Sequence, residues 1–183
     1  MLLDTPICDF GWQAPAFSLA DPDGKITSFT DAMGENGLLV AFICNHCPYV
    51  IAIAERLATD AATLQGAGLG VVGIMSNDYR DYPADSPANM KLFAQKYGFP
   101  FPYLVDEDQS VGKAYGAVCT PDFFGFDKTG GLQYRGRLDD AGMKGPVDNR
   151  VPELVNAMLD VAAGKPGPAH QTPSMGCSIK WSR

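Results

Sequence analysis

The sequence lacks any cluster of basic residues. Its 183 residues include 14 Lys and Arg against 21 Asp and Glu, which gives a formal net charge of -7 at pH 7. Proteins that bind nucleic acids or anionic membrane surfaces carry a basic patch. No apolar run approaches the roughly 20 residues that a membrane-spanning helix needs. We therefore expect neither nucleic acid nor a membrane as a partner.

Cysteine is also scarce, with five residues in the chain. That number is far too low for a disulfide-rich secreted scaffold. The first residues show no basic segment followed by an apolar one, so no secretory signal is expected. We expect a cytoplasmic protein, and in that reducing compartment a close cysteine pair is catalytic, redox-sensing or metal-binding.

Short apolar runs alternate with segments of helical periodicity. Strands are expected at 38–43 and 69–75, and a helix from a Cys47 cap to Gly66 joins them into a βαβ unit. The other expected elements are a hairpin (17–19 and 25–29), helices at 88–97, 110–115 and 152–163, a strand at 103–105, and an antiparallel pair at 123–127 and 132–138. The alternation is typical of the α/β class.

A cysteine pair stands where the strand at 38–43 meets this helix. Cys47 falls at the expected helix start, where backbone N–H groups and the helix dipole favour a thiolate. Cys44 lies three positions earlier, near enough for a disulfide if the two Cβ atoms approach to about 4 Å. His46 is the neighbour that is expected to support the thiolate and tune its redox potential.

The order of elements resembles the thioredoxin fold. The stretch 11–19 (GWQAPAFSL) with Asp23-Gly24, and the stretch 134–140 (YRGRLDD), are similar to the peroxiredoxin-like branch of that fold, the alkyl hydroperoxide reductase/thiol-specific antioxidant group. The resemblance covers 11–164. It implies a three-layer α/β/α sandwich with a mixed central sheet, an N-terminal β-hairpin extension and an extended C-terminal tail. We expect one domain over 1–164, with the tail 165–183 belonging to it.

The resemblance also assigns places to the cysteines. In thioredoxin-like reductases the first cysteine of the Cys-x-x-Cys motif is the nucleophile, and Cys47 aligns with it. Cys44 then aligns with the Ala that precedes that motif, and Val50 stands in place of the second cysteine. The Cys-x-x-Cys of this chain is thus displaced by one motif length toward the N-terminus.

Four further residues take their expected roles from the resemblance. Thr120 is expected to present its backbone to an extended substrate, and the Thr120–Pro121 bond is expected to be cis. Cys119 and the tail residue Cys177 are candidate remote resolving thiols beside Cys44.

Arg135 and Arg137 share one face of a strand, and we expect them to be solvated.

The resulting hypothesis is an antioxidant oxidoreductase in which the Cys47 thiolate attacks a peroxide or a disulfide and a second cysteine resolves the product. A thioredoxin- or glutathione-type thiol would restore the enzyme. No cofactor is expected, and an oligomer is compatible with the sequence. Two alternatives stay open, namely a copper- or zinc-binding thioredoxin-like protein and a non-catalytic binding module with this fold.

Overall fold

Two buried strands run through the middle of the computed structural model, which describes residues 1–145 and 147–183. They are β4 (Gly37–Phe42) and β5 (Leu69–Met75), both expected from their apolar runs. The Asn36 amide donates to Gly68 O at 3.0 Å at one end, and the Ile43 amide donates to Ile74 O at 3.0 Å at the other. The two strands therefore run parallel, as the βαβ pattern predicts.

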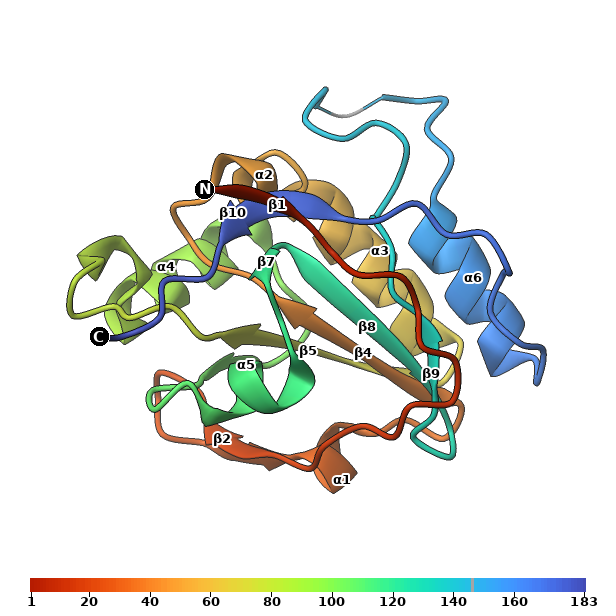
Figure 1. Cartoon of the computed structure of the whole chain (residues 1–183), viewed down its shortest axis with the longest axis horizontal. Coiled ribbons are helices and arrows are strands. Elements are labelled where there is room, and N and C mark those ends of the chain that lie inside the picture. The colour runs from red at the N-terminus through yellow and green to blue at the C-terminus, as the bar shows by residue number, and fades with distance from the viewer. Residues whose placement is uncertain (146) are drawn as a thin grey trace.

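The sheet extends on both sides of this central pair (Figure 1). Next to β5 lie the parallel β6 (Tyr103–Val105) and then the hairpin of β2 (Ser18–Ala20) and β3 (Ile26–Ser28). Next to β4 lie the antiparallel β8 (Asp122–Asp127) and β9 (Leu132–Tyr134). The last strand was expected to reach residue 138. It ends earlier because the amides of Arg135 and Arg137 bond to Gln171 and Thr172 of the tail instead of to β8.

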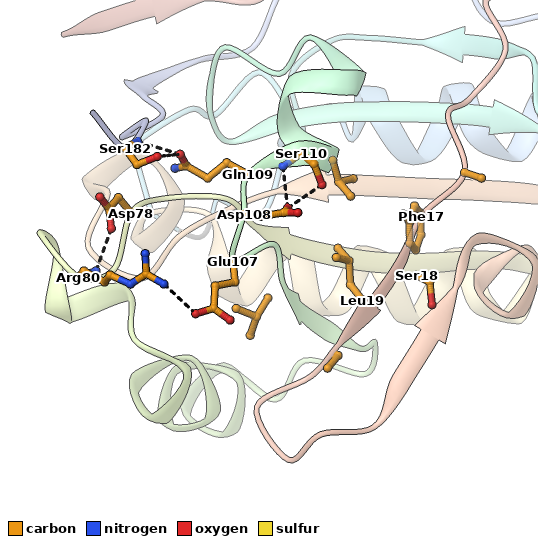
Figure 2. Close-up of a pocket in the computed structure, with 14 residues that line it drawn as sticks. Phe17, Ser18, Leu19, Asp78, Arg80, Glu107, Asp108, Gln109, Ser110 and Ser182 are labelled. Carbon is orange, nitrogen blue, oxygen red and sulfur yellow. Dashed lines mark hydrogen bonds and ion pairs between the residues drawn. The ribbon is translucent and has the colours of Figure 1, made fainter.

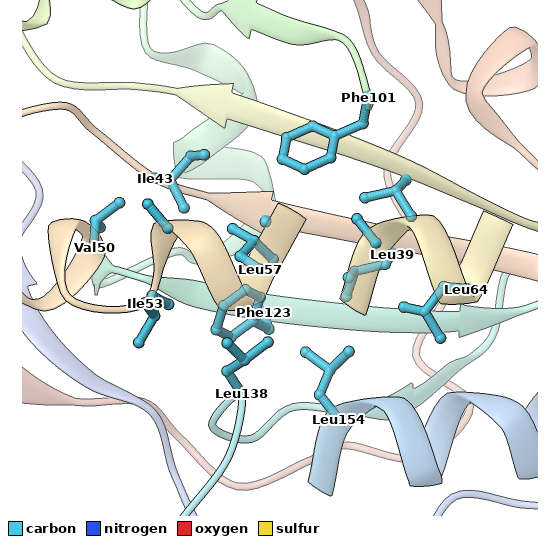
Figure 3. Packing of buried hydrophobic residues seen from close by; sticks show 14 of the residues in the cluster. Leu39, Ile43, Val50, Ile53, Leu57, Leu64, Phe101, Phe123, Leu138 and Leu154 are labelled. Atoms are coloured by element: carbon cyan, nitrogen blue, oxygen red, sulfur yellow. The ribbon is translucent and has the colours of Figure 1, made fainter. Parts of the chain in front are cut away.

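Alternation along β4 divides the core into two layers. Leu39 and Ala41 face one side of the sheet, and Leu38, Val40 and Phe42 face the other. The first side is covered by α3 (Ala54–Gly66), α4 (Pro87–Tyr97) and α6 (Glu153–Ala162). Figure 3 shows Leu57 and Leu64 of α3 and Leu154 of α6 beside residues of the sheet. The second side packs against α5 (Ser110–Tyr115) and a set of aromatic rings. This is the expected mixed-sheet α/β/α sandwich.

The helix that follows Cys47 is interrupted, contrary to the expectation of one helix to Gly66. It consists of α2 (Pro48–Ile51) and α3, with Ile53 as the residue before α3. The Ile53 amide bonds to Val50 O at 3.1 Å, a tighter turn than the α-helical one. β-branched residues such as Val50 and Ile53 crowd the preceding turn of a helix, which favours a break at this point.

The C-terminal tail forms a strand, β10 (Met175–Ser178), which the sequence analysis expected only as extended chain. It lies between β1 (Leu2–Asp4) and β7 (Cys119–Thr120) in a small antiparallel sheet. Figure 1 shows this sheet above the start of β8 and beside α2. The remaining short helices are α1 (Phe29–Ala32) and the 3₁₀ turn η1 (Pro83–Asp85). Among the described residues, no helix combines the length and the apolar character that crossing a bilayer requires.

Candidate active site around Cys47

Cys47 immediately precedes α2, with Pro48 in the first helical position as expected. The amides of Val50 and Ile51 bond to Cys47 O at 3.0 Å each, which fixes the backbone of the turn. Because α2 has four residues, its dipole is small, and the start of the helix is one of several influences on the sulfur.

The groups that lower the pKa of Cys47 are two neighbouring thiols and two amides. Hydrogen bonding from the Cys44 thiol is the strongest influence, and the thiol and amide of Cys177 and the amide of Val50 add to it. Together they lower the pKa of Cys47 from its ordinary value of 9.0 to about 4, although burial acts in the opposite direction. These hydrogen bonds favour the thiolate of Cys47 at neutral pH, although none of its surface is exposed.

Cys44 is the complementary partner of Cys47. Its hydrogen bond to Cys47, its burial and the negative charge of Asp85 hold its pKa well above the ordinary value, so it stays protonated. The Cys44 Sγ lies 3.3 Å from Thr120 Oγ1, and the Cys47 Sγ lies 3.1 Å from Thr120 O. The Thr120–Pro121 bond is cis, as the resemblance implies. Thr120 thus contacts both sulfur atoms of the motif.

Asp85 belongs to the site although the sequence analysis did not select it. It is fully buried and accepts hydrogen bonds from the amide of Asn45 at 2.8 Å, from Nδ2 of Asn77 at 2.8 Å and from Nδ1 of His46 at 2.7 Å. It lies in a polar loop that reads DYPADSP, where nothing distinguishes it from its acidic neighbour. Only the fold brings this carboxylate to Cys44.

His46 is directed toward Asp85, and its ring stacks on Tyr82 with centroids 5.8 Å apart. The main influences on the pKa of Cys47 come from other groups. Its place in the structure is beside Cys44, since His46, Asp85 and Cys44 each offer a donor atom within 4.8 Å of the other two. This geometry links His46 to the protonated thiol of the motif.

The tail residue Cys177 is the third thiol of the site. The register of β10 pairs it with Thr120 on one side and with Leu2 on the other. Burial and the hydrogen bond to Cys47 raise the pKa of Cys177, so it also is a neutral donor. Cys119, the other remote candidate, is buried with its Sγ 3.6 Å from Pro121 O, and burial raises its pKa to about 12. The structure thus brings Cys44, Cys47 and Cys177 together.

The group of Cys44, His46 and Asp85 is the one set of three metal-ligating side chains found in residues 1–145 and 147–183. A structural zinc site usually has four ligands. Here the carboxylate of Asp85 is already engaged by three donors, and Cys44 is held as a neutral thiol. The donor set suits a hydrogen-bonded thiol site better than a soft-metal site.

A polar hollow between β2 and the start of α5 is separate from the thiols (Figure 2). Its charged side chains satisfy one another, with Arg80 bonded to Glu107 and Asp108 bonded to Ser110. No cysteine lines it. We therefore assign the chemistry to the cluster around Cys47.

Comparisons with known proteins show the family to which the chain belongs. The model of the AhpC/TSA family matches residues 10–135, well over half of the chain. The chain belongs to the AhpC/TSA family. The resemblance seen in the sequence is confirmed.

Individual relatives cover most of the chain. A protein of Coxiella burnetii that carries a peroxiredoxin name is 28% identical over 156 residues, which are 82% of this chain and 98% of that protein. The crystal structure of an uncharacterized conserved protein from Geobacillus kaustophilus is 40% identical, with a TM-score of 0.93, over 100% of this chain and 97% of that one. The crystal structure of a peroxidoxin from Mycobacterium tuberculosis has a TM-score of 0.62 at 15% identity, over 85% of this chain and 96% of that one, and shows the shared fold.

The family defines the chemistry at the level of reaction class. The protein is a thiol-dependent oxidoreductase that reduces peroxides or disulfides and is restored by a thiol reductant. The alternatives of a soft-metal protein and of a non-catalytic module are not favoured.

Proposed function

We propose that the protein reduces small peroxides with Cys47 as the nucleophile. The observation that carries this proposal is the meeting of three cysteines at Thr120, which contacts the sulfur atoms of Cys44 and Cys47 and pairs with Cys177, together with hydrogen bonding that lowers the pKa of Cys47 to about 4. Only a thiolate attacks the O–O bond efficiently. The complete burial of Cys47 favours an oxidant of a few atoms over the disulfide of a protein.

The first step forms one S–O bond and breaks the O–O bond. The Cys47 thiolate attacks the terminal oxygen of the peroxide ROOH, which is transferred with its hydrogen to give the sulfenic acid, and the alkoxide RO⁻ leaves and takes up one proton to give ROH. A neighbouring thiol then attacks the sulfenic sulfur, which forms a disulfide and releases water. Cys44 and Cys177 both hydrogen-bond to Cys47 and are the two candidates for this second step.

Asp85 acts on the site through Cys44. Its negative charge contributes to the raised pKa of Cys44, and a protonated Cys44 is the strongest donor to the Cys47 thiolate. Asp85 is therefore a positioning residue, since its hydrogen bonds go to Asn45, His46 and Asn77 and it acts on Cys47 only through Cys44. His46 holds one oxygen of this carboxylate.

The reductant in this proposal is a thioredoxin- or glutathione-type thiol of the cytoplasm. Two thiol equivalents convert the enzyme disulfide back to two thiols and leave as one disulfide. No cofactor takes part in these steps, because both electrons are carried by sulfur.

The test is to identify the sulfur that is oxidised first. In a Cys44→Ser/Cys177→Ser double variant, treated with one equivalent of hydrogen peroxide and a 1,3-diketone that traps sulfenic acids, mass spectrometry should find the adduct on Cys47. A triple variant that also carries Cys47→Ser is the control and should give no adduct. An adduct on Cys119 or Cys8 with Cys47 unmodified would overturn the proposal.

A further inference from the structure

The expected docking edge for an extended substrate is already filled in this structure. Cys177 pairs with Thr120 and Ser178 pairs with Cys119, both antiparallel, so that β10 engages the backbone of β7. β1 pairs with the other edge of β10, where Leu2 faces Cys177. A free strand edge binds an extended peptide by adding it as a new strand. Here a segment of the same chain has been added in that way.

Gly176 shows how closely β10 is pressed against the Thr120–Pro121 turn. A Cβ atom at this position would lie 1.9 Å from Thr120 O and 2.5 Å from Thr120 C, which no side chain tolerates. The neighbouring Ser174 is buried and donates its hydroxyl to Pro121 O at 2.7 Å. The contact is therefore built for glycine, and any larger residue must displace the strand.

β10 also decides which sulfur can be reached from solvent. Cys47 has no exposed surface and Cys44 is 1% exposed, whereas Cys177 is partly exposed. β10 packs against α2, which directly follows Cys47, and hydrogen bonding from Cys177 contributes to the lowered pKa of Cys47. A bulky thiol reductant meets Cys177 first.

Given Cys47 as the nucleophile proposed above, we propose that β10 occupies the place of a peptide substrate. While β10 is paired with β7, only small oxidants reach Cys47. Cys177 is then the thiol on which the external reductant acts. Cys177 resolves the sulfenic acid and becomes half of a Cys47–Cys177 disulfide. The strand is thus a specificity-determining element of the reaction as well as the carrier of a relay thiol.

The Cys47 thiolate is regenerated by disulfide formation followed by two thiol–disulfide exchanges. The sulfenic acid of Cys47 and the thiol of Cys177 form an S–S bond and release water. A reductant thiolate then attacks Cys177 Sγ, the S–S bond breaks, and Cys47 leaves as a thiolate. This direction is favoured because a thiol of low pKa is the better leaving group. A second reductant thiolate attacks the first reductant sulfur, releases Cys177 as a thiolate that takes up a proton, and completes the reductant disulfide.

The first experiment displaces the strand with Gly176→Ala. Gly66→Ala is the matched control, because a Cβ there meets nothing within 4 Å. Each protein is assayed for reduction of hydrogen peroxide and of a synthetic peptide disulfide, with dithiothreitol as the reductant. We expect wild type and Gly66→Ala to reduce peroxide and to be slow on the peptide. Gly176→Ala should reduce the peptide at least tenfold faster than wild type.

The second experiment does not depend on moving the strand. After one equivalent of peroxide, mass spectrometry of wild type should find the Cys47–Cys177 disulfide as the main product. In Cys177→Ser, Cys47 should still be oxidised by a single equivalent, whereas recycling by dithiothreitol should slow at least tenfold.

The outcomes separate this proposal from the one on which it rests. If Cys47 is never oxidised in any variant, the assignment of the nucleophile fails. If Cys47 is oxidised but bonds to Cys44, with Cys177→Ser recycling at the wild-type rate, only the relay fails. If Gly176→Ala folds, as judged by thermal unfolding, and shows no gain on the peptide, the exclusion of peptides by β10 is wrong.

Discussion

Two buried thiols lie on either side of Thr120 and behave in opposite ways. Cys47 and Cys119 both have no exposed surface. The pKa of Cys47 is lowered to about 4, whereas burial, followed by the charges of Asp122 and Cys47, raises the pKa of Cys119 to about 12. Burial disfavours a charge at both places. The difference lies in the donors, since Cys47 receives hydrogen bonds from thiols and amides and Cys119 faces a carboxylate.

The surroundings of Cys119 form a structural unit of their own. Asp122 is buried and bonds to Arg135 at 3.0 and 3.3 Å and to the amide of Val118 at 3.1 Å. Arg135, expected to be solvated, is 9% exposed and stacks its guanidinium over Phe124, 4.3 Å from the ring centroid. The expectation for Arg135 was wrong because β9 ends before it and the tail covers it. In the mechanism that we propose, the Cys47 side of the turn carries the chemistry, and the Cys119 side supports the fold.

The largest expected effect separates the two thiols by activity. Cys47→Ser should lower peroxide turnover by about 10³-fold or more, because the reaction loses its nucleophile. Cys119→Ser should stay near the wild-type rate, because Cys119 remains protonated and takes no part. Steady-state turnover with dithiothreitol measures both. A large loss of peroxide turnover in Cys119→Ser, with Cys47→Ser still active, would show that Cys119 is the nucleophile and Cys47 is not.

The next effect concerns the stability that the Asp122–Arg135 ion pair beside Cys119 gives to the fold. Asp122→Ala leaves the guanidinium of Arg135 buried without its partner and should cost about 3–5 kcal/mol of the free energy of unfolding. Urea denaturation measures this, and the double variant with Arg135→Met serves as the control that removes both charges. Oxidation of Cys47 per folded molecule should persist. A cost below about 1 kcal/mol would show that the ion pair is dispensable.

A smaller effect is expected at the buried carboxylate on the thiol side. Asp85→Asn keeps the shape but replaces one acceptor oxygen by an amide NH2 that faces donor groups, which should cost about 1–3 kcal/mol. Removal of the charge should also lower the pKa of Cys44, since Asp85 contributes to its elevation. Alkylation of Cys44 against pH, in a Cys47→Ser background, measures this change. An identical profile with and without Asp85 would exclude its influence on Cys44.

The smallest effect isolates one donor of the thiolate. Cys177→Ala removes a thiol that lowers the pKa of Cys47, so this pKa should rise while that of Cys119 barely changes. The ultraviolet absorbance of the thiolate, followed against pH and compared with Cys119→Ala, reports the shift. A pKa of Cys47 that stays in place would mean that the amides and Cys44 suffice.

The elements of the fold that the sequence predicted best are those with strong local signals. Continuous apolar runs identified β4 and β5, and Pro48 after Cys47 marked the helix start. Each of these depends on residues adjacent in the chain, which is why pattern and spacing sufficed.

Other features depend on contacts between distant segments, and no local pattern reports them. β10 reads MGCS, which has no alternation or β-branched residue, and it becomes a strand only between β1 and β7. Asp85 reaches Cys44 from a polar loop about 40 residues away. The sequence named all three thiols of the site but could not show that Cys177, more than Cys119, would join Cys44 and Cys47.

The account depends on Cys47 being a thiolate at neutral pH, and the pH dependence of its reaction with peroxide tests this most directly. Single-turnover peroxide consumption, corrected with Cys47→Ser, should have a rate constant that is level from about pH 5 to pH 9 and falls only as the pH approaches 4, because protonation removes the nucleophile there. A rate constant that climbs about tenfold per pH unit up to the ordinary thiol pKa of 9.0 would contradict the account.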